Sequence, residues 1–143
     1  MNANVYQSAG IVSSYGNATS IICENCYNLG EISQVGSSWV SYATAKGIGG
    51  KTITNCYNFG KVISGQTKPS VIGESTSSMT SCYYNSELSG VTQDLEGITD
   101  VKDKEMQEVV DLLNNYKDES GSYPTDWKTW TLGENGYPTF VEN

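Results

Sequence analysis

The chain has 143 residues, a formal net charge of −8 and 10 tyrosines, and it contains neither histidine nor arginine. This length suits one ordinary domain that can bury a core without help from disulfides or metals. Without histidine and arginine, the chain has no imidazole for catalysis, no guanidinium groups to hold anionic ligands, and few of the side chains that recognise nucleic acids. An acidic surface also disfavours nucleic acids and anionic membranes as partners.

The negative charge is confined to the second part of the chain. Residues 1–90 carry four acids and four lysines, whereas residues 91–143 carry twelve acids and four lysines, which accounts for the whole −8. We therefore predict two structural units that meet near residue 90. The first ten residues, MNANVYQSAG, contain no apolar signal segment, so the protein is either cytosolic or exported by a signal outside this sequence.

A short motif recurs three times before residue 90. The copies centre on Cys26, Cys56 and Cys82, which are thirty and twenty-six residues apart. Each cysteine follows Asn or Ser and precedes a tyrosine, and apolar residues lie three positions before it and six after it: Cys23, Ile53 and Met79, and Ile32, Val62 and Leu88. A period of this size is typical of stacked repeats that share one core.

The repeats have the composition of β-strands. Short runs of β-branched and aromatic residues are separated by Gly, Asn and Ser, without helical periodicity before residue 100. We predict a mainly β fold, a short parallel β-solenoid of about three coils (5–32, 33–62 and 63–90), whose equivalent residues stack about 4.8 Å apart. The second coil is expected to form three strands, including 53–57 and 60–64. Asparagines at the bends are expected to form ladders that satisfy backbone groups.

The repeats read AGIVSSYG…NCYNLGEIS, KGIGGKTITNCYNFGKVIS and SCYYNSELSG, and the tail contains EMQEVVDLLNNY and ENGYPTF. This pattern resembles the GLUG repeat of bacterial surface proteins, including regions beside the catalytic parts of some immunoglobulin A metalloproteases, and the tail resembles the helix and Asn-Gly-Tyr-Pro segment that often close such arrays. The resemblance covers about residues 5 to 141, and the chain departs from the pattern at Ala9, Lys46 and the third copy. It implies a β-solenoid on an exported bacterial cell-surface protein, and it implies no catalytic residue.

The first repeat also contains a Cys-x-x-Cys motif. Zinc binding would join Cys23 and Cys26 to Cys56 and Cys82, but there is no second Cys-x-x-Cys, and Cys23 occupies the position filled elsewhere by Ile53 and Met79. A position that accepts Cys, Ile and Met is a core position. We expect buried free thiols, with one disulfide as the alternative, and we predict no metal site and no cofactor.

Residues 91–143 are predicted to form an acidic cap over the last coil. Asp103 is a plausible N-cap for a helix at about 103–116 with an apolar stripe at Met106, Val109, Val110, Leu112 and Leu113. The Asn-Gly pair in ENGYPTF predicts a β-hairpin at about 127–141. Dense acids along the helix are interpreted as a solvated face, because they lack the spacing of a calcium loop.

Aromatic residues are the candidate ligand-binding groups. If Tyr27, Tyr57 and Tyr83 point outward, they form a row of flat apolar faces of the kind that binds sugars. Trp127 and Trp130 are open to the same interpretation, or they pack beneath the helix. Spacing alone leaves the direction of the tyrosines open, because apolar positions three residues apart fit neither strand nor helix periodicity.

The sequence does not predict an enzyme. Glu31, Lys61 and Glu87 share one repeat position and are interpreted as a surface charge ladder. We therefore expect a non-catalytic structural or adhesive module of an exported surface protein, with a carbohydrate-binding module of a secreted enzyme as the alternative. Its expected partners are preceding solenoid coils, because the first coil begins abruptly at Val5, a host protein or glycan, and a second copy joined edge to edge through the N-terminal coil.

Overall fold

The computed structural model describes residues 2–3, 7–9, 11, 21–34, 44–64 and 69–142. The chain divides into two compact units, Met1–Lys102 and Asp103–Asn143. The first unit consists mainly of short strands. In chain order they are β1 (Asn2–Ala3), β2 (Gln7–Ala9), β3 (Ile22–Glu24), β4 (Tyr27–Asn28), β5 (Ile32–Gln34), β6 (Thr44–Ile48), β7 (Thr52–Thr54), β8 (Tyr57–Asn58), β9 (Val62–Ser64), β10 (Ser70–Ile72), β11 (Ser78–Thr80), β12 (Cys82–Tyr84) and β13 (Ile98–Asp100).

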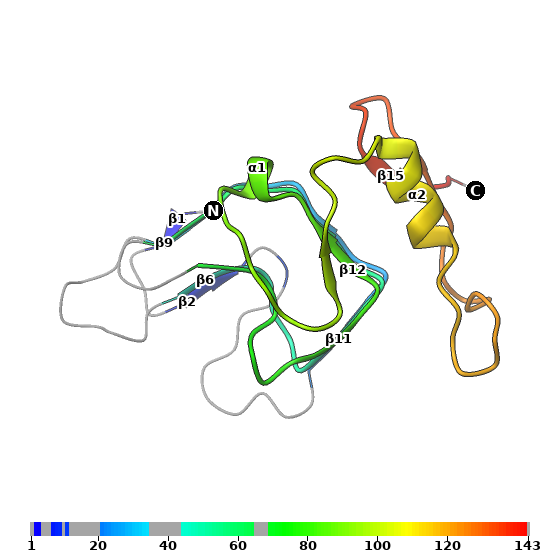
Figure 1. Ribbon diagram of the computed structural model, residues 1–143, viewed down its shortest axis with the longest axis horizontal. Helices are drawn as coiled ribbons and strands as arrows, with labels where there is room; N and C mark the ends of the chain where they lie inside the picture. The colour runs from blue at the N-terminus through cyan, green and yellow to red at the C-terminus, as the bar shows by residue number, and fades with distance from the viewer. Residues whose placement is uncertain are drawn as a thin grey trace. The chain divides into compact units, whose positions relative to one another are not determined.

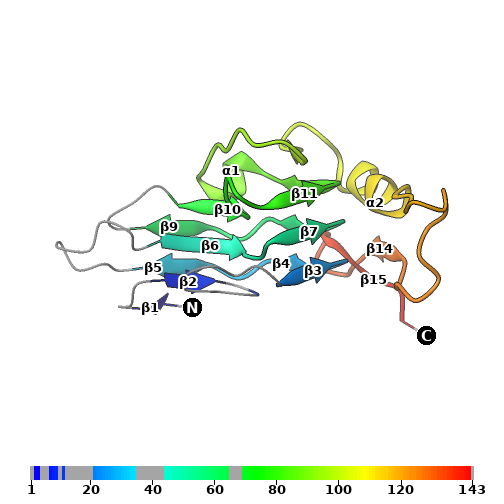
Figure 2. The same ribbon diagram turned by 90° about the horizontal axis from the view of Figure 1, so that it is seen from below.

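Each strand of the first unit pairs in parallel with the equivalent strand of another repeat. The sheets have the orders β1-β5-β9, β2-β6-β10, β3-β7-β11 and β4-β8-β12-β13. Strands of successive repeats superimpose in the view of Figure 1, and Figure 2 shows the same strands as layers. The structure is thus mainly β, with parallel sheets consistent with a β-helix-like fold.

A left-handed bend precedes each aligned cysteine. Asn25, Asn55 and Ser81 have φ angles of 52°, 54° and 53°, a region that asparagine tolerates better than most residues. The backbone N–H of Asn25 donates to the Thr54 carbonyl at 2.9 Å, so the bend is also bonded to the next repeat. The prediction of one strand over 53–57 was therefore wrong, because the bend at Asn55 divides it into β7 and β8.

The predicted stacking of equivalent residues is confirmed in two columns. Cys23 pairs with Ile53, and Ile53 pairs with Met79, in the sheet β3-β7-β11, and all three side chains are buried. Ile32 pairs with Val62, and both are also buried. Because Cys23 belongs to the hydrophobic cluster of the first unit, it behaves as the apolar core residue that the alignment indicated.

The third copy leaves the pattern after its tyrosines. Residues Ser86–Ser89 form a helical turn, α1, which Asn85 caps by accepting hydrogen bonds from the N–H groups of Glu87 and Leu88. Leu88 is consequently 38% exposed and does not continue the column of Ile32 and Val62. The predicted ladder of Glu31, Lys61 and Glu87 is wrong for the same reason, since Glu87 lies in this helix.

The first unit extends beyond both predicted limits. β1 lies before residue 5, and Asn2 pairs with Ser33. The repeat alignment predicts that Val5 is equivalent to Ile32, but this pairing gives a different register, so that prediction was wrong. Val5 itself lies outside the described residues. At the other end, β13 pairs in parallel with β12, with Ile98 opposite Cys82, so the chain up to Lys102 belongs with the repeats. The charge change near residue 90 reflects surface composition and does not mark the boundary.

The second unit consists of α2 (Met106–Asn114) and an antiparallel pair, β14 (Trp130–Leu132) and β15 (Pro138–Phe140). The predicted helix and hairpin are present, with shorter bounds than expected. Asp103 is not the N-cap. Glu105 takes that place in a capping box, in which its backbone N–H donates to the Glu108 carboxylate at 2.8 Å.

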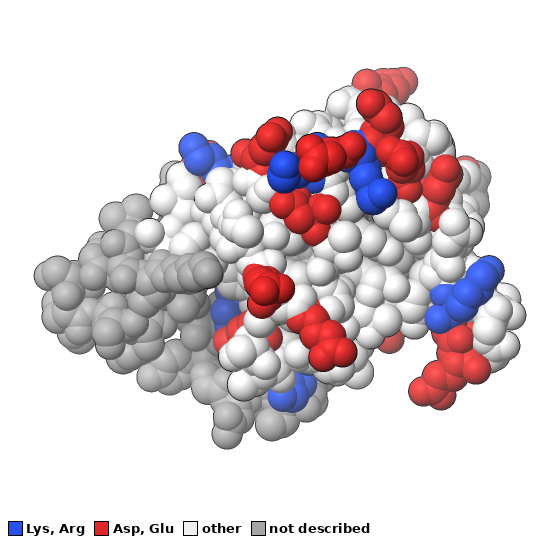
Figure 3. Space-filling view, in the orientation of Figure 1, with Lys and Arg blue, Asp and Glu red and all other residues white. Residues whose placement is uncertain are grey.

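Helix α2 buries one side and exposes its acids. Val109, Val110 and Leu113 are buried, as is Trp130 of β14, whose backbone N–H donates to Asn114 Oδ1 at 2.8 Å. Glu105, Glu108 and Asp111 are exposed, as the solvated-face interpretation predicted. Figure 3 shows acidic side chains spread over the visible surface with lysines between them. Within the described residues, no helix is long and apolar enough to cross a membrane.

Candidate functional site

The three tyrosines proposed as a ligand surface form one column. Tyr57 in β8 pairs with Tyr27 in β4 and with Tyr83 in β12. The rings of Tyr27 and Tyr57 stack, with centroids 5.2 Å apart and planes inclined by 11°. Cys82 and Tyr84 belong to the core cluster, so Tyr83 between them points to the opposite face of the sheet.

The tyrosine column is not an open platform. Tyr57 is fully buried, Tyr83 is 8% exposed and Tyr27 is half-buried, while Phe59 lies with its ring centroid 4.6 Å from that of Tyr57. Burial raises the pKa of the Tyr83 phenol, and a hydrogen bond with Ser81 partly opposes this. The repeat thus brings the three rings together, but they do not present three exposed faces.

The two cysteines of the Cys-x-x-Cys motif belong to different columns. Cys23 stacks with Ile53, and its thiol donates to the Gly49 carbonyl at 3.2 Å. Cys26 precedes Tyr27 and so lies next to Cys56, and its thiol donates to the Glu24 carbonyl at 3.0 Å. All four cysteines are free thiols. Among the described residues, no group of three or more His, Cys, Asp or Glu side chains is placed to hold a metal ion.

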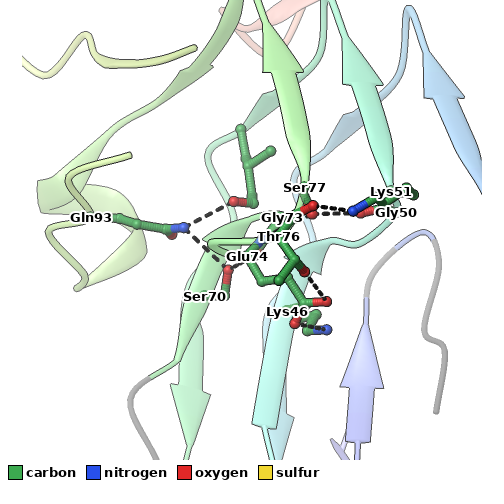
Figure 4. A network of polar contacts seen from close by, with 10 residues as sticks. Lys46, Gly50, Lys51, Ser70, Gly73, Glu74, Thr76, Ser77 and Gln93 are labelled. Atoms are coloured by element: carbon green, nitrogen blue, oxygen red, sulfur yellow. Dashed lines mark hydrogen bonds and ion pairs between the residues drawn. The ribbon is translucent and has the colours of Figure 1, made fainter. Parts of the chain in front are cut away.

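A cleft of about 360 Å³ lies beside β6 and β10 of the first unit. Its lining combines charged, hydroxyl and amide side chains with two apolar ones: Lys46, Pro69, Ser70, Glu74, Ser75, Gln93, Asp94 and Leu95. Lys46 projects from β6, and its Nζ lies 3.1 Å from Glu74 Oε2 (Figure 4). The Lys46 side chain is only 8% exposed whereas that of Glu74 is 53% exposed, so the pair holds a nearly buried ammonium at the base of the cleft.

Gln93 forms another wall of this cleft by completing the edge of β10. Its side-chain oxygen accepts from the Val71 N–H at 2.7 Å, and its amide nitrogen donates to the Ile72 carbonyl at 2.9 Å. The same nitrogen donates to Ser70 Oγ at 3.3 Å (Figure 4). The Tyr84 hydroxyl holds the Gln93 backbone by donating to its carbonyl at 3.0 Å and accepting from its N–H at 3.1 Å. The Gln93 amide is therefore bonded to β10 and the Lys46 ammonium is paired with Glu74, so both groups already have partners within the protein.

Sequence reasoning missed this cleft. In the sequence, Lys46 is a departure from the GLUG-like pattern, and a lysine between Ala45 and Gly47 is itself a signal of a buried charge. Nothing in the sequence identifies Gln93 as a residue of this cleft, because its contact with β10 depends on the path of the chain after α1.

The second unit holds a separate aromatic cleft. Trp127 is half-buried, its ring stacks with that of Tyr116 at 5.2 Å, and the Tyr123 ring meets it edge-on at 6.0 Å. The cleft has a volume of about 370 Å³ and is lined by Thr125, Asp126, Trp127, Lys128, Thr129 and Val141. The two tryptophans therefore differ, since Trp130 is buried against Phe140 with ring centroids 4.4 Å apart.

No protein-family model, curated protein or solved structure matches this chain.

Proposed function

We propose that the chain is a non-catalytic structural or adhesive module of an exported bacterial surface protein, related to the GLUG-repeat proteins. In this proposal it is a short parallel β-solenoid of about three coils, closed by the helix-plus-hairpin unit, and it acts as a stiff spacer or recognition surface. It would lie at the cell surface and continue preceding coils of a longer parent protein. Its partners would be a host protein or glycan, or a second copy joined through a strand edge.

The observation that carries the proposal is the repetition of one backbone geometry. The left-handed bend recurs at Asn25, Asn55 and Ser81, and side chains at two of these bends are bonded directly, with Asn55 Nδ2 donating to Asn25 Oδ1 at 3.0 Å. A second ladder joins Asn28 Nδ2 to Asn58 Oδ1 at 2.9 Å. Side-chain ladders added to parallel backbone bonding stiffen a stack along its axis, which suits a load-bearing or display role.

The proposal is tested by measuring binding and turnover on the same protein. The chain is titrated with a panel of host and bacterial glycans while its tyrosine and tryptophan NMR signals are recorded, and polysaccharides are assayed for newly formed reducing ends. A spacer leaves every signal unchanged, and a recognition module shows shifts confined to one surface. Release of reducing ends above a buffer control would overturn the non-catalytic proposal.

The aromatic cleft around Trp127 favours the alternative, a carbohydrate-binding module of a secreted enzyme. A half-exposed indole flanked by Asp126 and Lys128 offers a pyranose both a flat apolar face and charged hydrogen-bonding partners. Under this alternative, Trp127→Ala abolishes any glycan-induced shift, whereas Leu132→Ala, an exposed position outside the cleft lining, retains it. If no glycan shifts the Trp127 signals, the alternative fails.

A further inference from the structure

Three cysteines form a continuous column through the first unit. Cys26, Cys56 and Cys82 each precede one of the paired tyrosines, so they occupy neighbouring positions directly before β4, directly before β8 and at the start of β12. The Tyr57 N–H donates to the Cys26 carbonyl at 3.1 Å, and the Tyr83 N–H donates to the Cys56 carbonyl at 2.9 Å. Adjacent parallel strands lie about 4.8 Å apart, a Cα separation within the range that disulfides span.

The sulphur of Cys56 is the centre of this column. It accepts a hydrogen bond from the backbone N–H of Cys26 at 3.4 Å, and its thiol approaches the Cys23 carbonyl at 3.7 Å. The Cys56 thiol donates to the Thr54 carbonyl at 3.2 Å, and the strand register places Cys56 between Cys26 and Cys82. Cys56 is fully buried, and it is the common neighbour of the other two thiols.

Cys26 differs from the other three cysteines in its access to solvent. It is half-buried, whereas Cys23, Cys56 and Cys82 are buried. The neighbouring Cys56 side chain lowers the pKa of the Cys26 thiol to about 7, helped by the Glu24 backbone, although partial burial and the Glu24 carboxylate oppose this. Burial raises the pKa of the Cys23 thiol, and the pKa of the Cys56 thiol is raised as well by its cysteine neighbours and by burial, so neither of these thiols is the first to react with an oxidant. A thiolate that solvent can reach is the form of cysteine that reacts with oxidants.

We propose that Cys26 is a peroxide-reactive thiol and that Cys56 resolves its oxidised form into a reversible Cys26–Cys56 disulfide. The Cys26 thiolate attacks one oxygen of hydrogen peroxide, the O–O bond breaks, and the sulphur is oxidised to a sulfenic acid while hydroxide leaves and takes up a proton from water. The Cys56 thiol then attacks the Cys26 sulphur and gives its proton to the departing hydroxyl group, so the S–S bond forms and water leaves. Two thiols are oxidised, and one hydrogen peroxide molecule is reduced to two waters.

Cys82 has a distinct place in this scheme. The neighbouring Cys56 side chain lowers the pKa of the Cys82 thiol too, but Cys82 is buried, so an oxidant in solution reaches Cys26 first. Because Cys56 can join only one neighbour at a time, oxidation by one equivalent of peroxide leaves two thiols, Cys82 and Cys23. This inference does not depend on the proposed spacer or adhesive role.

The test is oxidation of the full chain with one equivalent of hydrogen peroxide, followed by tryptic mass mapping. Cleavage after lysine separates peptide 1–46, which carries Cys23 and Cys26, from 52–61, which carries Cys56, and from 62–102, which carries Cys82. We expect peptides 1–46 and 52–61 to be linked, and the link to disappear on reduction. The same link is expected in the Cys23→Ser and Cys82→Ser variants and not in Cys26→Ser.

Alkylation kinetics provide a second readout that does not require a disulfide. At pH 7, iodoacetamide is expected to modify Cys26 at least about tenfold faster than each buried thiol. Circular dichroism of Cys26→Ser checks that this half-exposed substitution leaves the fold intact. Persistence of the 1–46/52–61 link in a folded Cys26→Ser variant, exclusive linkage of 52–61 to 62–102, or four unmodified thiols after peroxide treatment would each overturn the proposal.

Discussion

Asn55 and Asn25 occupy the same left-handed bend in successive repeats, and Asn55 Nδ2 donates to Asn25 Oδ1 at 3.0 Å. The ladder stops there, because the third bend has Ser81 in place of asparagine. Among the side chains that the structure describes, none donates a hydrogen bond to the buried Oδ1 of Asn55. An unsatisfied buried carbonyl of this kind is destabilising.

Extending this ladder is expected to stabilise the first unit. In Ser81→Asn, the new amide donates to Asn55 Oδ1 just as Asn55 donates to Asn25, and asparagine also suits the φ of 53° better than serine. We expect a gain of about 1 kcal/mol in the free energy of unfolding, measured by urea denaturation. Ser78→Asn, at an exposed position in β11, is the control and should gain nothing; an equal gain there would contradict the ladder explanation.

Two equivalent glycines are expected to differ sharply in their tolerance of a side chain. A Cβ on Gly60 would lie 2.2 Å from the Gly30 carbonyl oxygen and 2.7 Å from Asn28 Nδ2, whereas among the described residues a Cβ on Gly30 meets only Asn28 Oδ1, at 3.6 Å. Gly60→Ala should therefore cost about 3 kcal/mol or more, and Gly30→Ala less than about 1 kcal/mol. Thermal unfolding of the two variants side by side makes the comparison, and similar losses would show that stacking at this bend is looser than described.

The pair Lys46–Glu74 is expected to respond asymmetrically to mutation. Glu74→Gln leaves a nearly buried ammonium without its carboxylate and should cost about 1–2 kcal/mol of unfolding free energy. Lys46→Met removes the buried charge, keeps the apolar length of the side chain, and should remain within about 1 kcal/mol of the parent chain. Denaturant unfolding of both variants measures this difference. A larger loss in Lys46→Met than in Glu74→Gln would contradict it.

Asp100 is expected to make the fold sensitive to acid. Partial burial acts to raise its pKa, but hydrogen bonds from Ser86 and Lys102 together hold the pKa of this carboxyl below its ordinary value. The ionised form therefore favours the folded state. Its contribution is complete above the unfolded-state pKa of about 3.9 and is lost as the pH falls through the lower folded-state value.

The corresponding variant is Asp100→Asn. It should be less stable than the parent chain at pH 7, and it should lose less stability between about pH 5 and pH 3. Urea unfolding at several pH values measures both effects. Asp94→Asn, at an exposed position, serves as the matched control, and identical acid profiles for Asp100→Asn and the parent chain would rule out a role for this carboxylate.

Repeat alignment predicted the columns but not the direction of every side chain. Cys23 and Cys26 are three residues apart, and residues with this spacing face opposite sides of a regular strand. The left-handed bend at Asn25 interrupts the strand between them, so the alternation of side chains starts anew after the bend. The same bend turns Tyr27 away from the core. The spacing of the tyrosines does not indicate which way they point. The backbone geometry of the bend decides which side chains after it face the core.

The sequence by itself determined the repeat, its period and the residues that share a column, because equivalent residues in a stack occupy equivalent environments and are selected alike. Tertiary structure decided the features that depend on contacts between distant segments. These include the nearly buried charge of Lys46 and the clamp of Gln93 on β10. Such contacts form only when parallel strands of successive repeats are brought to adjacent positions, which no local pattern in the chain encodes.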